Sequence, residues 1–223
     1  MKFEEIKSRC EFIKNSIEST GGEVQELMIK PPASMEDIKF VERELKNEIP
    51  ETFIKVLSEF SSSFSFRWFL PDPYLNQEYT ENKPSKFKEI FSGSPNWSLD
   101  LLTQHQLVVS DYIKTVCPNP EDPYDAVWHN KFAFCSVENG DYLAIDLDPN
   151  EKEKVVYLSH NGGVGHGYKL ANNIIELLDN WSRVGFVGCE DFQWIIFTES
   201  PNSGINPDSE TANEFRNWLN LNL

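Results

Sequence analysis

The sequence contains few residues that could form cross-links. Its 223 residues include 4 cysteines and 4 histidines, and no two cysteines form a C-x-x-C pair. A secreted scaffold held by disulfides is smaller and denser in cysteine. We therefore expect free, mostly buried thiols in a reducing cytoplasm. The cysteines are Cys10, Cys117, Cys135 and Cys189.

Long apolar runs are also missing. No stretch approaches the roughly 18 apolar residues of a membrane-spanning helix. Residues 1–6 lack the apolar segment of a signal peptide. These absences predict a cytoplasmic protein without a membrane span.

Basic residues are too few to balance the acidic ones. The chain has 20 lysines and arginines against 36 aspartates and glutamates, a net charge of −16, with most of the excess in the C-terminal half. A general nucleic-acid binder needs a basic face for phosphates, and an anionic membrane attracts basic segments. The charge therefore argues against both and favours a basic protein partner.

Apolar and aromatic residues, in contrast, are plentiful. Hydrophobic residues make up 39% of the chain and aromatic residues 13%, which excludes a disordered polypeptide. A chain of this length buries about 70% of its unfolded surface without a metal or disulfide staple. We expect one domain over residues 1–223.

Apolar spacing predicts helices at both ends of the chain and strands between them. Helices are predicted over 2–20, from Ser34 to 49, and over 51–60, 100–116, 170–181 and 215–221. Strands are predicted over 24–29, 64–70, 131–137, 142–145, 155–158 and 194–197, with 71–96 as a loop outside the core. Asn139-Gly140 predicts a hairpin turn with positive φ at both positions. The fold class is α+β, a mostly antiparallel central sheet flanked by helices.

Three segments only partly match ligand-binding motifs. The glycine-rich residues 161–167 lack the Gly-Lys-Ser/Thr of a phosphate-binding loop. His160 and His166 are not spaced as zinc ligands. Residues 146–157 begin like a calcium loop, but Glu151 and Tyr157 stand where glycine and glutamate are required. We therefore expect no metal and no cofactor.

Catalytic signatures are equally weak. The pair Glu138 and Asp141 could perform acid–base chemistry, but proximity means little among 36 acidic residues. No serine or cysteine lies in a nucleophile elbow. We expect a protein that is not an enzyme. An enzyme that acts on a small molecule is kept as a further hypothesis. It would require a pocket that contains titratable groups with perturbed pKa values.

Several segments, taken in order, resemble the SUKH superfamily, which includes the yeast Smi/Knr cell-wall regulator. They are Pro32–Ile38, Val41–Leu45, Ile49–Phe53, the hairpin 134–147, the strand 155–160 and the helix 170–178 with Trp181. The resemblance covers 31–185, leaving 1–30 as an N-terminal helical extension and 186–223 as a C-terminal extension. The chain departs from the family at Ser61-Ser62-Ser63, where Asn-Gly is usual.

The resemblance implies an α+β fold and, in bacteria, a cytoplasmic immunity protein. Such proteins bind and neutralise polymorphic toxins, often nucleases or other nucleic-acid-modifying enzymes. The family is generally non-enzymatic and supplies no catalytic residues to transfer. Its eukaryotic members imply the alternative, a regulatory scaffold of cell-wall synthesis or signalling.

The predicted interface combines acidic and aromatic residues in loops beside predicted strands. Opposite charge speeds the encounter with a basic toxin, and aromatic anchors slow its release. The candidate partner-binding residues are Trp68, Asp72, Tyr74, Asp122, Tyr124, Asp125 and Asp141.

Overall fold

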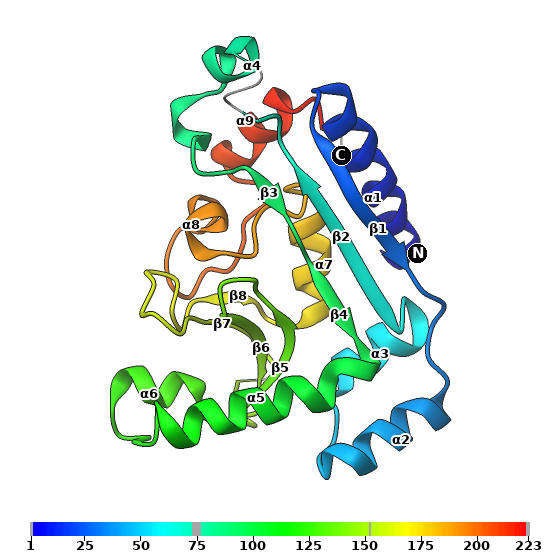
Figure 1. The fold of residues 1–223 in the computed structure, drawn as a ribbon, viewed down its shortest axis with the longest axis vertical. Helices are drawn as coiled ribbons and strands as arrows, with labels where there is room; N and C mark the ends of the chain where they lie inside the picture. Colours follow the sequence, from blue (N-terminus) through cyan, green and yellow to red (C-terminus); the bar gives the residue numbers. More distant parts are fainter. Residues whose placement is uncertain (1, 73–76, 152, 222–223) are drawn as a thin grey trace.

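Two antiparallel sheets lie side by side in the molecule (Figure 1). The computed structural model describes residues 2–72, 77–151 and 153–221. In the first sheet, β2 (Ser63–Phe69) pairs with β1 (Glu23–Ile29), β3 (Ser92–Gly93) and β4 (Asn96–Ser98). The second has the order β5 (Lys131–Ser136), β6 (Tyr142–Asp146), β7 (Val155–Leu158) and β8 (Lys169–Ala171). The α+β class is confirmed, with two sheets in place of one central sheet.

Helices surround the sheets and follow the apolar spacing of the sequence. Those before the second sheet are α1 (Lys2–Ser19), α2 (Met35–Leu45), α3 (Glu51–Glu59), α4 (Gln77–Asn82), α5 (Leu102–Thr115) and α6 (Pro123–Trp128). Those after it are α7 (Ile174–Ser182), α8 (Asp191–Trp194) and α9 (Glu210–Trp218). Short 3-10 turns cover Ser85–Phe87, Leu99–Leu101 and Ile195–Phe197. Helix α2 begins after Ser34, where a helix was predicted to start. Ser34 and Asp37 form a capping box there, in which each side chain accepts the other's backbone N–H, at 3.1 and 3.2 Å.

Several local predictions are wrong. Residues 194–197 are helical, because the buried Trp194 and Phe197 are three apart, which is helical spacing. The helix predicted over 170–181 begins only at Ile174, since β8 precedes it. Residues 71–96 contribute Phe87 and Ile90 to the core, because aromatic contacts hold this segment against α9.

The buried side chains of both extensions join those of the central segment in one cluster. Ile6 and Ile13 of α1 and Phe215 of α9 have no exposed surface and belong to the same apolar cluster as Phe64 and Leu177. A shared core is what a single cooperative unit requires. That the whole chain is one domain remains a prediction.

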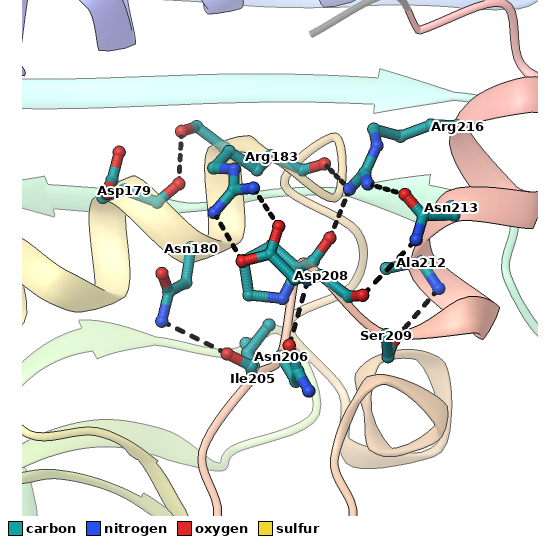
Figure 2. Close-up of polar contacts among 12 residues, drawn as sticks. Asp179, Asn180, Arg183, Ile205, Asn206, Asp208, Ser209, Ala212, Asn213 and Arg216 are labelled. Carbon is teal, nitrogen blue, oxygen red and sulfur yellow. Dashed lines mark hydrogen bonds and ion pairs between the residues drawn. The ribbon is translucent and has the colours of Figure 1, made fainter.

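Polar contacts also attach the C-terminal extension to α7 (Figure 2). The Asn180 amide on α7 donates to the carbonyl oxygen of Ile205 at 3.2 Å, and Arg183, directly after α7, forms an ion pair with Asp208. The guanidinium of Arg216 donates to the carbonyl oxygens of Arg183 and Pro207, at 3.1 and 2.5 Å. On α1, Arg9 pairs with Asp179 of α7 at 2.7 Å. Helix α7 therefore contacts both extensions.

Replacing Gly93 with alanine is expected to destabilise the protein by about 2 to 3 kcal/mol, because overpacking forces the core to shift. A Cβ at Gly93 would lie 2.4 Å from both the carbonyl oxygen of Phe186 and the indole nitrogen of Trp68. The carbonyl belongs to the backbone and cannot rotate away. Urea unfolding followed by tryptophan fluorescence measures the change. Ser98→Ala on β4 is the control, and equal midpoints for both variants would contradict the close contact.

Candidate functional site

The loops at one end of the second sheet carry a group of carboxylates, which we call the loop face. It comprises the β5–β6 turn, the loop after β7, the start of α6 and the start of α8. Its named residues are Glu121, Asp122, Tyr124, Asp125, Glu138, Asp141, His160, Glu190 and Asp191. The Asn139 amide joins the turn to Glu190 at 3.4 Å, and the Tyr124 hydroxyl joins α6 to the carbonyl oxygen of Ser159 at 2.6 Å.

The predicted hairpin turn lies between β5 and β6, but its backbone geometry differs from the predicted one. Gly140 alone of the central pair has a positive φ, 97°. Its N–H donates to the carbonyl oxygen of Val137 at 2.9 Å, and the N–H of Val137 donates to that of Asp141 at 2.8 Å. This turn directs Asp141 inward, beneath the residues that follow β7.

Asp141 is the centre of the hydrogen-bond network under the loop face. Its side chain is 4% exposed. Its carboxylate accepts the Tyr157 hydroxyl at 2.6 Å, the His160 N–H and Nδ1 at 2.7 Å each, and the Asn139 amide at 2.9 Å. Burial alone would raise the pKa of Asp141, but these hydrogen bonds outweigh it and hold the pKa below its ordinary value. The carboxylate thus fixes both loops.

His166 ties the loop after β7 to α6. Its Nδ1 accepts the N–H of Ser159 at 3.0 Å, so Nε2 carries the proton and donates to the carbonyl oxygen of Tyr124 at 3.1 Å. The ring stacks on that of Tyr124 with centroids 4.2 Å apart. Burial lowers the pKa of His166, which favours this neutral form.

The carboxylates of the loop face repel one another where α8 begins. Burial raises the pKa of Glu190, and the nearby charges of Asp141 and Asp191 raise it further. Glu138 is exposed and pairs with Arg67 at 2.5 Å. A cation at this position would compensate the crowded negative charge. The face therefore suits a positively charged partner.

The Asp141–His160 pair is also the arrangement by which some enzymes orient a histidine. Among the described residues, no hydroxyl or thiol forms a hydrogen bond with the His160 ring. Nor, within residues 2–72, 77–151 and 153–221, do three histidine, cysteine, aspartate or glutamate side chains come together as a metal site. What the contacts show is that Asp141 joins the β5–β6 turn to the loop after β7 through His160.

The structure gathers four of the seven predicted interface residues at the loop face. Asp122 is exposed and caps α6 by accepting the N–H of Tyr124 at 2.8 Å. Tyr124 and Asp125 are half-buried beside it, and Asp141 lies under the neighbouring turn. Asp141 is too buried to contact a partner broadly, so its part is to position the loops.

The other three predicted residues lie elsewhere. The prediction that Trp68 binds a partner is wrong. Its side chain is fully buried, and its indole N–H donates to the carbonyl oxygen of Gly185 at 3.1 Å, so it offers no surface to a partner. The sequence does contain a signal for this burial. Side chains alternate along β2, which places Phe64, Phe66 and Trp68 on one buried face. Asp72 is exposed just after β2, and Tyr74 lies outside the described residues.

Sequence reasoning missed Glu190 and Asp191. Both lie in the predicted C-terminal extension, and only the tertiary fold brings that segment beside the hairpin. Their charge was visible, but no local pattern linked them to Asn139 or Gly165, which they contact at 3.4 and 2.8 Å.

Together the fold and the loop face define an α+β protein whose carboxylates are displayed on fixed loops. Residues 32–180 match the model of the SMI1 / KNR4 family (SUKH-1). Because the match spans more than half of the chain, the protein belongs to this family. The matched range agrees with the core inferred over 31–185 and leaves both extensions outside. A search of curated proteins found no match. Across the described residues, no helix is both long and apolar enough to cross a bilayer.

Proposed function

We propose that the chain is a non-enzymatic, cytoplasmic immunity protein that neutralises a basic, nucleic-acid-targeting toxin by stoichiometric binding. The observation that supports this most is the loop face, where Glu121 and Glu138 are exposed and Glu190 is half-buried, in a chain of net charge −16. A toxin that acts on nucleic acid needs a basic surface for phosphates. Carboxylates on the immunity protein would compete for that surface.

The loops carrying these carboxylates are held in place before any partner arrives. The Asp141 network fixes the hairpin turn, and His166 fixes the loop after β7. Fixed loops lose little conformational freedom on binding, which favours affinity. The charge of the whole chain would also speed the encounter with a basic partner.

A regulatory scaffold is the second candidate, and membership of the SMI1 / KNR4 family is consistent with it as well as with an immunity protein. A scaffold would have several weak partners, whereas an immunity protein would have one dedicated partner.

The test is an affinity capture from the source organism's lysate, washed over a salt series. We expect one basic partner at equal stoichiometry, released by salt. The triple variant Glu121→Lys, Glu138→Lys and Glu190→Lys should bind it about 100-fold more weakly, since three lost surface pairs of about 1 kcal/mol each amount to that factor.

The matched control reverses three exposed glutamates outside the loop face, Glu11, Glu23 and Glu59. An equal loss in both triple variants would mean that only net charge matters. Unchanged affinity of the loop-face variant in low salt would remove this face as the interface. Several substoichiometric partners would support the scaffold.

A further inference from the structure

A groove lies at the opposite end of β6 from the loop face. Its volume is about 680 Å³, and we call it the α2–α3 groove. One wall is α2 with the connection into α3, and the other is the connection between β6 and β7. The lining residues used below are Met35, Glu48, Glu51, Ile54, Leu147 and Glu153.

Long-range hydrogen bonds hold the two walls of the groove together. The Glu153 carboxylate accepts the N–H groups of Glu51 and Thr52 at 2.8 and 2.9 Å, which caps the start of α3. Glu153 does this with a φ of 63°, a conformation uncommon for a residue other than glycine. Glu42 accepts the N–H of Ile49 at 3.0 Å and fixes the connection between the helices. The groove is therefore preformed.

The groove combines an apolar floor with a rim on which carboxylates outnumber cations, since Lys39 is the one basic residue among its described lining residues. Met35 is 49% exposed and Leu147 37% exposed, and Ile54 is half-buried between the walls. On the rim, Glu48 and Glu51 are exposed and form no ion pair with any described residue. The neighbouring Asp146, in contrast, already forms ion pairs, because Lys131 and Lys154 lie 3.2 and 3.7 Å from its carboxylate.

We propose that the α2–α3 groove binds a short segment of a partner protein in which lysine or arginine alternates with apolar residues. The aliphatic stems and apolar side chains would cover Met35, Ile54 and Leu147, while the cationic groups would reach Glu48 and Glu51. A polyamine has the charge but lacks apolar side chains for the floor. A second copy of this chain carries the same net charge of −16 and would be repelled. This proposal does not depend on the function of the loop face.

The test uses the full chain and a short fluorescein-labelled peptide in which arginine and leucine alternate, followed by fluorescence anisotropy. Glu48→Lys is expected to weaken binding about tenfold, because it replaces an attractive rim charge with a repulsive one. Leu147→Ser should weaken it severalfold through the floor. Both side chains are partly or fully exposed, so circular dichroism should show an unchanged fold.

The control Glu11→Lys makes the same charge change on α1 and should leave binding within about twofold of the wild type. Hydrogen exchange should show protection over 47–54 and 146–149. The proposal is overturned if a glutamate–leucine peptide or spermine binds as tightly, or if Glu11→Lys weakens binding as much as Glu48→Lys does. The groove proposal is also overturned if the loop-face triple variant abolishes peptide binding while the groove variants do not. That result would place the peptide at the loop face and would leave the proposed function standing. Self-association that involves Leu147 would instead assign the groove to a second copy.

Discussion

Removing residues 186–223 is expected to unfold the whole chain, although the family match ends at residue 180. Phe186 and Phe215 have no exposed surface, and Phe215 packs with ring centroids 5.2 Å from Phe87 and 5.3 Å from Phe197. Deleting one such phenylalanine side chain costs about 3 to 5 kcal/mol, and a domain is stable by only about 5 to 15 kcal/mol. The measurement is far-UV circular dichroism and urea unfolding of the fragment 1–185.

A point variant separates loss of packing from truncation itself. Phe215→Ala should lower the free energy of unfolding by about 4 kcal/mol. Asn217→Ala, an exposed change on the same helix, should lower it by less than about 0.5 kcal/mol. A fragment 1–185 that unfolds cooperatively with the stability of the full chain would show that the C-terminal extension is a separate unit. The prediction of one domain would then be wrong.

Asp141→Asn is expected to destabilise the protein by about 2 to 3 kcal/mol at neutral pH, because hydrogen bonds to a buried charged group contribute about that much. An amide cannot accept from Tyr157, Asn139 and both His160 donors as the carboxylate does. Urea unfolding measures the loss. The control is Asp111→Asn, an exposed carboxylate on α5, which should change stability little.

The effect of Asp141→Asn should also depend on pH in a defined direction. The folded-state pKa of Asp141 is lowered from its ordinary value of 3.8, so the unfolded chain takes up the proton first as pH falls. The stability that the carboxylate contributes is therefore complete above that ordinary value and is lost as pH falls through the folded-state pKa. The gap between wild type and variant should close in acid. A gap that widens below the ordinary pKa would contradict the network.

Much of the fold was visible in the sequence because local patterns and tertiary packing agree. Apolar spacing over residues 2–20 predicted α1, and Ser34 was the predicted start of the helix observed as α2. Asn139-Gly140 located the hairpin. Each of these signals depends on a few neighbouring residues, so no distant contact was needed to interpret them.

The errors arise where distant segments decide the outcome. A three-residue apolar run such as 195–197 fits either a strand or a helical turn, and the packing of Phe197 against the distant Phe215 favours the turn. Trp68 was predicted to face a partner because loops follow it, whereas the alternation of β2 buries it. Four of the predicted interface residues do lie together, yet Glu190 and Asp191 join them only through the fold.

The central claim is that this chain neutralises a harmful partner by binding it. The most direct test is to express the captured partner in a heterologous host, alone and together with this chain at matched levels. The account predicts that the partner alone stops growth and that the wild-type chain restores it. The triple variant at Glu121, Glu138 and Glu190 should fail to restore it, while the control triple variant succeeds. A partner that is harmless alone, or growth that stays arrested although the two proteins form a complex, would contradict the account.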